Sequence, residues 1–516
     1  MPVHGKTNLL GIAASLRNAR WGAGRRSLIE RLKTIETEEE LFEFLEAESN
    51  LLLDSFVQAG RAEGKDFLQI YGNLKKSNGE SGLSNSEVAL AAALWSAHRR
   101  GASIDHLSLP EYFTASGDVR KPDELKAHLM AADGLLISGP VYFGDRGSLA
   151  ESLIQFIRAD AELSASVRGK LYGGIAVGAK RNGGQETTLI YQMQDMMNLG
   201  MYAVGNDSDT TSQYGGTGHA GDVGTMFKDR YGLETSMGTG RRMADVLGFL
   251  GAEGRLKDRP RMLFAVLQDN KQVGQRTVDE IVAHFSGEMD VTVLDVSGKS
   301  IKRCIACDIC PTHISVDADY RCIIKSRDDD LQELHQLMLS HDAIVPVVVS
   351  LKDTSSEISN YQEFVERTRY LRRGDYVFSN LTTTPLVLEE LGLHSPIGLR
   401  AMTSFLRHHT VMTRAAYGVV RDGEVLNLDD VHEQIAAGLE AARRVTVGRL
   451  AHAASTQAPK YQPVGYILSV AKDEEDEKLK NRRRMIEDRA DRMADEAENR
   501  LDLSDEAADI RSEKVA

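Results

Sequence analysis

The sequence predicts an α/β protein with two doubly wound parallel sheets, one in each half of the chain. Short apolar runs that suit strands buried on both faces alternate with segments of helical periodicity along most of the 516 residues. In addition, residues 133–158 align without a gap with residues 342–367. Alternating strands and helices predict right-handed crossovers and a parallel sheet that is covered on both faces.

Composition and charge narrow the class of protein. The formal net charge is −14, which argues against a nucleic acid or an anionic membrane as partner. No apolar run approaches the length of a membrane span, and the N-terminus lacks a charged segment followed by an apolar one. We therefore expect a cytoplasmic protein that binds neither nucleic acid nor a membrane.

The first half of the chain is organised around residues 133–158. The apolar run 135–137 predicts a buried strand, which should end at Gly139-Pro140 because proline cannot donate to a ladder. An aromatic loop, 142–144, and an amphipathic helix with apolar residues between 149 and 157 follow. Ligands of doubly wound sheets bind at the carboxyl ends of the strands, so this loop is a candidate ligand site. An ordinary turn whose aromatic side chains merely pack is the alternative.

The remaining elements of the first half follow from the same periodicities. Strands are expected at 8–14, 103–109, 171–177 and 201–204, and helices up to 98 and at 122–132, 188–199 and 241–250. His219 lies in a stretch rich in Gly, Thr and Ser, so we expect a solvated loop residue rather than a catalyst.

A candidate phosphate loop follows the first strand. The hydroxyl, guanidinium and backbone N–H groups of Ser15-Leu16-Arg17 can hold a phosphate. Residues 18–81 are predicted to be an insertion of two amphipathic helices and a polar loop. The insertion would separate the phosphate loop from the helix that the N-cap signature Gly82–Ser86 begins. A separate helical hairpin with no bearing on the site is the alternative.

Four motifs together resemble the NADPH-dependent FMN reductase family, and in particular its iron–sulfur flavoprotein branch. They are Ser15-Leu16-Arg17, Gly82-Leu83-Ser84-Asn85-Ser86, Gly139-Pro140-Val141-Tyr142-Phe143-Gly144 and Gly183-Gly184-Gln185-Glu186. Residues 218–247 also resemble the closing loop and helix of that branch. The resemblance covers about residues 7–250 apart from the insertion.

The resemblance implies a flavodoxin-like fold with the strand order 2-1-3-4-5 and a bound FMN. It implies that Ser15, Arg17, Asn85 and Ser86 contact the FMN phosphate. It also implies that the isoalloxazine ring is framed by Pro140, Val141, Tyr142, Phe143, Gly144, Gly178, Lys180, Gly183 and Gly184.

A second set of elements extends over residues 258–448. Strands are expected at 261–267, 291–296, 376–379 and 410–417 and in the aligned stretch itself, and helices at 273–285, 331–339 and 398–406. Val349, Leu351 and Asp353 stand where the first half has Pro140, Tyr142 and Gly144. Gln268-Asp269-Asn270 replaces Ser15-Leu16-Arg17, and a carboxylate there would repel a phosphate. We expect a degenerate flavodoxin-like domain and one FMN per chain.

All four cysteines of the chain are candidate metal ligands. They are Cys304, Cys307, Cys310 and Cys322. Two overlapping C-x-x-C steps let three thiolates converge, which favours a [4Fe–4S] cluster. The position after the second strand also resembles the iron–sulfur flavoprotein branch, although the eleven-residue gap before Cys322 is longer than in that branch. A four-thiolate zinc site and no metal are the alternatives. His313 could replace Cys322, but a polar loop histidine is the simpler interpretation.

The composition changes after residue 448. Residues 451–465 have the composition of a linker. From Asp473 onward the chain contains sixteen acidic and ten basic residues. A weak apolar stripe at helical spacing runs from Ile486 to Leu501. The two interpretations are a partly disordered, solvated tail and a helix that docks on a neighbouring subunit.

The sequence therefore predicts three parts: an FMN-binding domain (1–257), a degenerate domain with the cysteines (258–448) and a tail (449–516). The predicted function is an FMN-dependent oxidoreductase that passes electrons between a [4Fe–4S] cluster and FMN to reduce a small molecule. NAD(P)H or a ferredoxin-type protein would be the donor, and the chain would form a homo-oligomer. No side chain is identified as a general acid or nucleophile.

Two alternatives stay open. One is an NAD(P)H-dependent quinone or FMN reductase with a structural second domain. The other is a redox-sensing or assembly protein without turnover.

Overall fold

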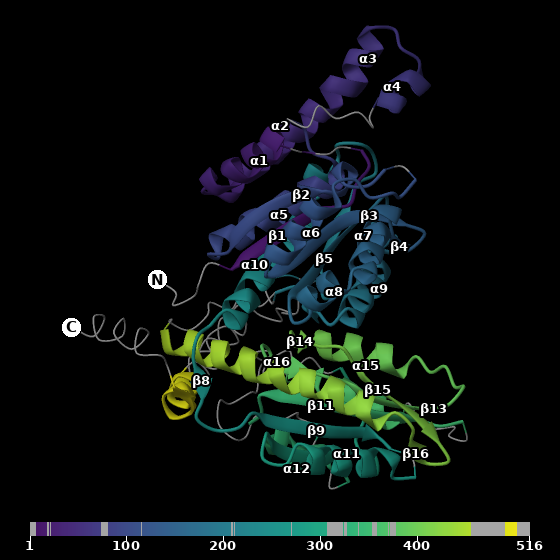
Figure 1. Ribbon diagram of the computed structural model, residues 1–516, viewed down its shortest axis with the longest axis vertical. Coiled ribbons are helices and arrows are strands. Elements are labelled where there is room, and N and C mark those ends of the chain that lie inside the picture. Colours follow the sequence, from purple (N-terminus) through teal and green to yellow (C-terminus); the bar gives the residue numbers. More distant parts are fainter. Residues whose placement is uncertain are drawn as a thin grey trace, which may run out of the picture. The chain divides into compact units, whose positions relative to one another are not determined.

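The computed structural model of the chain divides into two compact units, which we name the N-terminal unit (within residues 6–248) and the C-terminal unit (within residues 249–516) (Figure 1). The structure describes residues 7–17, 20, 22–73, 81–114, 116–207, 210, 212–269, 271–306, 324, 328–338, 340–352, 359–369, 371, 378–455 and 491–502. Among the helices in these ranges, none combines the length and the apolar character needed to cross a membrane.

Four parallel strands form the centre of the sheet in the N-terminal unit, in the order β2, β1, β3, β5. They are β1 (Asn8–Ala13), β2 (Ser103–Ser108), β3 (Gly134–Tyr142) and β5 (Leu171–Gly178). Two short strands pair in parallel with β5: β6 (Tyr202–Ala203) along its first residues and β7 (Gly216–His219) along its last. The order second, first, third, fourth, fifth is that of flavodoxin-like folds. It confirms the α/β class and the strand order predicted for this unit.

Helices connect the strands of this sheet. They are α5 (Asn85–Arg99), α6 (Pro122–Ala131), α7 (Ser148–Ala159), α8 (Ala161–Val167), α9 (Gln185–Asn198) and α10 (Arg230–Leu250). The Ala/Leu-rich helix α5 is buried from Ser86 to Ala97. In α7, apolar residues on one face, among them Leu149, Leu153 and Ile157, are buried.

Four elements differ from the sequence prediction. Strand β3 continues beyond Pro140 to Tyr142. Proline is tolerated there because β1 ends opposite Ser138, so no ladder bond to β1 is lost at Pro140. Helices α9 and α10 begin earlier than predicted, at Gln185 and Arg230. Strand β7 was not predicted, because its Gly-Thr-Gly-His sequence has little strand propensity of its own.

The two helices predicted for the insertion are present, but residues 59–62 and 67–73 of the predicted polar loop are helical as well. The insertion contains α1 (Gly22–Thr34), α2 (Glu38–Leu53), a π-helical turn (Asp54–Gln58), α3 (Ala59–Ala62) and α4 (Phe67–Asn73), drawn in purple to violet in Figure 1. Thr37 caps α2, since its side chain accepts a hydrogen bond from the N–H of Glu40.

The sheet of the C-terminal unit has the same order of strands along the chain: second, first, third, fourth, fifth. Its parallel strands are β9 (Arg261–Gln268), β10 (Asp290–Asp295), β11 (Ala343–Ser350), β12 (Thr382–Thr383), β13 (Leu386–Glu390), β14 (Val411–Met412) and β15 (Ala416–Arg421). β10 pairs with β9, β9 with β11, β11 with both β12 and β13, β12 with β14 and β13 with β15. The edge strand β16 (Glu424–Val425) is antiparallel to β15.

The fourth and fifth strands of this unit are each split in two. The predicted fourth strand at 376–379 is wrong where it can be checked: residues 378–380 form a turn, and residues 376 and 377 lie outside the described ranges. The actual fourth strand begins inside the Thr-Thr-Thr-Pro stretch 382–385, where β12 lies, and continues after it as β13. The polar stretch conceals the short apolar run Leu386–Leu388 from a prediction based on periodicity.

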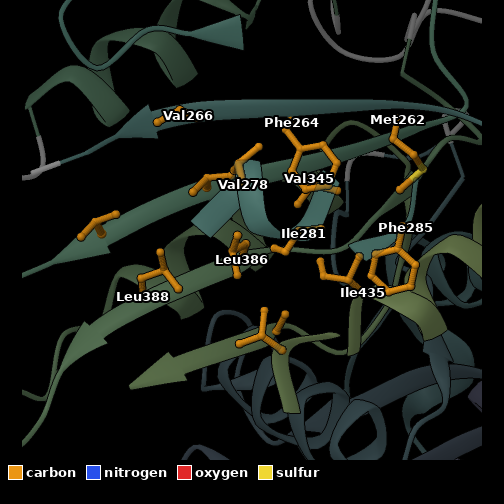
Figure 2. Packing of buried hydrophobic residues seen from close by; sticks show 14 of the residues in the cluster. Met262, Phe264, Val266, Val278, Ile281, Phe285, Val345, Leu386, Leu388 and Ile435 are labelled. Carbon is orange, nitrogen blue, oxygen red and sulfur yellow. The ribbon is translucent and has the colours of Figure 1, made fainter. Parts of the chain in front are cut away.

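The core of the C-terminal unit lies between its sheet and helices α11 (Val273–His284) and α16 (Leu428–Ser455). Figure 2 shows alternate residues of β9 (Met262, Phe264 and Val266) in the same core cluster as residues of both helices, including Ile281 and Ile435. A period of two along the strand places these side chains on one face. Helices α12 (Leu331–Met338), α13 (Ser359–Arg367) and α15 (Ile397–Leu406) complete the unit.

Equivalent aspartates mark the internal repeat. The carboxylate of Asp133 accepts a hydrogen bond from the N–H of Asn8 at 2.7 Å, and that of Asp342 accepts one from the N–H of Arg261 at 2.9 Å. In both units this residue immediately precedes the third strand, and its partner begins the first strand. The gap-free alignment of 133–158 with 342–367 thus joins residues that occupy the same place in the two sheets.

The described part of the tail, residues 491–502, packs on the C-terminal unit of its own chain. Residues 491–500 are helical, and β17 (Leu501–Asp502) pairs with β8 (Arg255–Leu256). Ala497 and Leu501 of the predicted apolar stripe are buried against Val447 and Leu450. For these residues neither earlier interpretation holds, because the apolar stripe already has an intrachain partner.

Candidate functional site

The aromatic loop after β3 is the tip of a tight hairpin. Val141 and Tyr142 pair in antiparallel fashion with β4 (Asp145–Arg146), and the two residues at the turn, Phe143 and Gly144, have φ values of 54° and 80°. Positive φ at both positions is typical of a type I′ turn. The side chain of Phe143 is fully exposed, and that of Tyr142 is 56% exposed. A bulky residue held in the left-handed region with its ring in solvent is a feature of binding loops.

A buried glutamine organises the second predicted ring loop, residues 178–184. The side-chain oxygen of Gln185 accepts a hydrogen bond from the N–H of Gly183 at 2.7 Å. Its amide nitrogen donates to the carbonyls of Lys180 (2.8 Å) and Gly218 (3.1 Å). Gln185 was not predicted as a site residue; an amide directly after two glycines at a helix start is the signal that could have found it.

The two ring loops meet at their glycines. Gly184 has a φ of 105°, and a Cβ at this position would lie 2.7 Å from the Cα of Gly144. Only glycine allows this approach, because any side chain would collide with the backbone of the other loop. The structure therefore brings the 140–144 and 178–184 residues predicted for the isoalloxazine together at the carboxyl ends of β3 and β5.

Replacing Gly184 with alanine is expected to weaken FMN binding by at least tenfold. The left-handed backbone costs about 1–2 kcal/mol for a residue with a Cβ, and the contact with Gly144 must also open. Titration of FMN fluorescence measures the change. Gly72→Ala is the matched control, since a Cβ there meets nothing within 4 Å. Equal affinities of the two variants would contradict the assignment of Gly184 to the ring site.

The start of helix α5 offers donors for an anion. The Oγ of Ser84 accepts from the N–H of Glu87, and the first intrahelical bond runs from Val88 to the carbonyl of Ser84. The N–H groups of Asn85 and Ser86 therefore have no acceptor within the helix. Ser84 and Ser86 are buried, and Asn85 is half-buried.

Ser15 and Arg17 follow β1 near this helix start. Ser138 links the elements: its carbonyl accepts from the N–H of Ala14, and its hydroxyl donates to the carbonyl of Ser86, both at 2.8 Å. The hydroxyl of the buried Ser15 accepts from the N–H of Arg17 at 3.3 Å, and the side chain of Arg17 is exposed. The predicted phosphate residues are thus neighbours despite about 70 intervening residues.

The side chain of Asn85 is used differently from the prediction. Its amide nitrogen donates to the carbonyl of Asp222 at 2.9 Å, and its oxygen accepts from the N–H groups of Thr225 (3.1 Å) and Met226 (3.2 Å). These bonds hold the predicted closing loop onto the helix start. Asn85 would therefore meet an anion through its backbone N–H.

A buried arginine ties the two ends of the insertion together. Arg20 forms an ion pair with Glu48 and donates to the carbonyls of Gly24 and Gly82, each at 3.2 Å. Glu48 in turn accepts from the N–H of Gly82 at 2.7 Å. Because the chain leaves and returns at one place, the insertion does not separate the phosphate loop from helix α5.

The insertion also contacts the closing loop. Val223 lies in a small apolar cluster with Leu52, Val57 and Ile70, and the guanidinium of Arg230 lies 3.5 Å from the centre of the Phe42 ring. The insertion therefore supports the loop that Asn85 holds, which disfavours the alternative of a hairpin without bearing on the site.

His219 is part of the sheet and not a solvated loop residue as predicted. It is half-buried, ends strand β7 and lies opposite Gly178 of β5. Asp229 accepts from its N–H at 2.7 Å and forms an ion pair with Arg181, which also donates to the carbonyl of Thr217 at 3.0 Å. Arg181 and Asp229, which the sequence did not single out, join the second ring loop to the closing loop.

Of the four cysteines, only Cys304 lies in the described ranges. It is partly exposed, and its sulfur accepts from the N–H of Ala306 at 3.4 Å. Cys307, Cys310 and Cys322, as well as His313, lie outside the described residues. Over the described part of the chain, no three potential ligands group around a metal position.

The chain on both sides of the cysteine segment is anchored by a buried ion pair. Arg367 contacts Asp329 at 2.7 Å with both side chains fully buried, and it donates to the carbonyl of Lys302 at 2.7 Å. Asp329 also accepts from the N–H of Lys302 at 3.1 Å. Residues 302 and 329 are therefore held next to each other.

In the C-terminal unit a carboxylate of the chain itself occupies the helix start. Asp269, which follows β9, accepts from the N–H groups of Gly274 (2.7 Å) and Gln275 (3.0 Å) at the beginning of α11. Leu351 and Val349 are buried, while Asn270 and Asp353 lie outside the described ranges. The donors that would hold an anion are already bonded.

Comparison with known proteins identifies similar sequences over part of the chain. The profile of the NADPH-dependent FMN reductase family matches residues 67–214. An iron–sulfur flavoprotein from Methanocaldococcus jannaschii is 38% identical over 125 residues, which are 24% of this chain and 64% of the relative. An iron–sulfur flavoprotein from Methanosarcina thermophila is 29% identical over 179 residues, covering 32% of this chain and 88% of the relative.

A quinone-reducing enzyme is also similar. The NAD(P)H dehydrogenase (quinone) of Caulobacter vibrioides is 27% identical over 190 residues, 32% of this chain and 92% of that protein. The chain thus spans less than two thirds of the first relative and nearly all of the others. Together with the strand order of the N-terminal unit, these matches place residues 67–214 in a domain of the NADPH-dependent FMN reductase and iron–sulfur flavoprotein family, a family of flavin-dependent oxidoreductases.

Proposed function

We propose that this chain is an FMN-dependent oxidoreductase in which the N-terminal unit binds FMN and the cysteine segment of the C-terminal unit binds a [4Fe–4S] cluster. The observation that carries the FMN part is the convergence of a helix start and two glycine-bearing loops at one edge of the sheet. The N–H groups of Asn85 and Ser86 lie near Ser138, and Gly144 contacts Gly184 where β3 and β5 end. A dianion and a planar ring need these two kinds of surface side by side.

The residues present fit FMN. The backbone N–H groups of Asn85 and Ser86, the hydroxyl of Ser15 and the guanidinium of Arg17 would hold the phosphate. The exposed Tyr142 and Phe143 and the backbone of 178–184 would frame the isoalloxazine. When bound, FMN would supply one- and two-electron chemistry and the cluster single-electron transfer. The chain would hold the ring in place, and the closing loop at 219–228 would limit access of water.

We propose that the C-terminal unit is a degenerate flavodoxin-like domain that binds no flavin. Its strand order and the equivalent positions of Asp133 and Asp342 support the repeat. Asp269 at the start of α11 supports the loss of the phosphate site, because a second anion would be repelled and would find its donors occupied.

We propose Cys304, Cys307, Cys310 and Cys322 as cluster ligands. Their spacing and the names of two relatives support the cluster over zinc. Arg367 and Asp329 hold Lys302 and residue 329 next to each other, so the segment that carries the four cysteines begins and ends at one place. We further propose a small-molecule substrate, NAD(P)H or a ferredoxin-type donor, and a homo-oligomeric assembly.

The visible spectrum and metal content of anaerobically purified protein test this function. We expect one FMN per chain and about four iron atoms. Two FMN per chain would contradict the role of Asp269, and absence of flavin would contradict the site. A yellow protein with zinc in place of iron, fully active with NAD(P)H, would favour a quinone or FMN reductase with a structural second unit. The Caulobacter relative supports that second candidate.

A further inference from the structure

A buried carboxyl group and a buried imidazole lie beneath the start of helix α5. Glu87, the third residue of the helix, is 1% exposed, and its carboxylate accepts from the N–H of Ser84 at 3.1 Å and from the hydroxyl of Ser108 at 3.0 Å. His106 of β2 is also 1% exposed, and its Nε2 lies 3.7 Å from Glu87 Oε1. Within the described residues, neither ring nitrogen of His106 has a hydrogen-bond partner.

The cations near this cluster are engaged elsewhere. Arg20 pairs with Glu48, and Arg25 of α1 pairs with Asp105 of β2. In the described part of the chain, no Lys or Arg forms an ion pair with Glu87, and His106 is the only basic side chain within 4 Å of its carboxylate.

The charge state of the cluster depends on Glu87. Burial raises the pKa of Glu87 above its ordinary value, although the hydrogen bonds from Ser84 and Ser108 and the charge of Arg20 oppose this shift. Burial, together with the charges of Arg20 and Arg25, lowers the pKa of His106 to about 3, so this imidazole is neutral at pH 7. His106 is therefore neutral, and Glu87, whose pKa is raised, is the member of the pair whose charge can respond to an anion bound nearby.

Glu87 lies in the same helical turn as the donors proposed for the FMN phosphate. Asn85 and Ser86 immediately precede it, and their N–H groups are those without an intrahelical acceptor. A phosphate at these donors carries a charge of about −1.5 to −2 at pH 7. An ionised Glu87 would add a like charge behind the same helix start, in a region from which water is excluded.

We propose that Glu87 takes up a proton from solvent when FMN binds, so that occupation of the site is linked to pH. The inference rests on the proposed FMN function. The protonated carboxyl has two acceptors beside its Oε1, the hydroxyl oxygen of Ser108 at 3.0 Å and the neutral imidazole Nε2 of His106 at 3.7 Å. Because FMN raises the proton affinity of Glu87, FMN affinity is highest below the pKa of Glu87 in the free protein. It falls up to tenfold per pH unit until the pKa of the complex is reached, and is constant above that.

The test is the FMN dissociation constant between about pH 5 and pH 9 for the wild type and for Glu87→Gln. The amide is nearly isosteric with the carboxylic acid and can still accept from the N–H of Ser84. The second ionisation of the FMN phosphate, near pH 6, affects both proteins equally. We expect the wild type to lose affinity relative to Glu87→Gln as pH rises, by up to tenfold per unit. Parallel pH profiles would overturn the proposal.

Two further measurements do not depend on that variant. Calorimetry of FMN binding to wild-type protein in buffers of different ionisation enthalpy counts the protons taken up, and a count of zero across the whole pH range overturns the proposal. Ser108→Ala removes one hydrogen bond to the carboxylate and should move the fall in affinity to higher pH. If wild-type protein binds no FMN at any pH, the proposed function itself fails. If FMN binds but its affinity has the same pH dependence in the wild type and in Glu87→Gln, only the proposed role of Glu87 is contradicted.

Discussion

Replacement of Cys304 by alanine is expected to abolish iron binding and the cluster's visible absorption while one FMN per chain stays bound. A four-thiolate cluster that loses one ligand is no longer held on all its irons. The flavin would be unaffected because every residue proposed to hold it lies between Ser15 and Gly184, in the N-terminal unit. Iron and flavin analysis of anaerobically purified protein, with its absorption spectrum, measures both outcomes.

The neighbouring residue provides the control. Ile305→Ala changes a side chain that is 67% exposed and carries no ligand atom, so its iron content should equal that of the wild type. Loss of flavin together with iron in Cys304→Ala would show that the two units do not divide the cofactors as proposed. Unchanged iron would remove Cys304 from the ligand set.

Replacement of Arg500 by alanine is expected to destabilise the C-terminal unit by about 3 kcal/mol. The guanidinium of Arg500 is 4% exposed and contacts Asp342 and Asp258, each at 2.6 Å, as well as Glu496. Among the residues that the structure describes, its removal leaves the buried carboxylate of Asp342 with one ion-pair partner, Arg449 at 2.9 Å. The estimate is at the lower end of the range for a broken buried pair because that contact persists.

Amide hydrogen exchange in β9 and β11 measures this effect. A loss of about 3 kcal/mol corresponds to roughly a hundredfold faster exchange. Tryptophan fluorescence is unsuitable, since both tryptophans, Trp21 and Trp95, precede residue 249. Arg255→Ala is the matched control: Arg255 also contacts the tail, at Asp502, but it is 82% exposed, so at most about 1 kcal/mol is expected. Equal exchange in the two variants would contradict the importance of the buried network.

The same network makes the C-terminal unit sensitive to acid. Burial alone would raise the pKa of Asp342, but the hydrogen bond from Arg500 and the charges of Arg449 and Arg500 outweigh it and lower this pKa. A folded-state pKa below the unfolded one contributes stability that is present above the unfolded pKa, near 3.9, and is lost as pH falls through the folded value. In Arg500→Ala this loss should begin at a higher pH.

Much of the fold could be predicted from local patterns. Buried strands such as β3 and β11 read as continuous apolar runs because they are covered on both faces. The N-cap signature Gly82–Ser86 marked the start of α5, which the structure places directly after Ser84. Strands with little propensity of their own were missed or misplaced. β7 is Gly-rich, and the fourth strand of the C-terminal unit begins within the Thr-Thr-Thr-Pro stretch 382–385 and is split there. Pairing with neighbours decides such strands.

The sequence indicated which segments to expect at the candidate site but not the hydrogen bonds that connect them. The loops 140–144 and 178–184 and the helix start at 85–86 were expected from motifs, and they do converge at one edge of the sheet. The roles of Gln185, Arg181 and Asp229 were not predicted, because each acts on backbone groups far away in the sequence. A motif shows which residue types are present, whereas the partner of a buried amide depends on the folded chain.

Local sequence patterns were enough to predict the α/β class, the repeat of one unit in the two halves, and a carboxylate, Asp269, where the first half has its candidate phosphate loop. These follow from periodicity, alignment and charge, which are local properties of the chain. Three features became apparent only in the folded chain: Asp269 caps α11, the insertion returns to its starting point through Arg20, and Arg500 is buried against Asp342. The physical reason is that a buried polar group must find a partner, and the fold decides which distant residue supplies it.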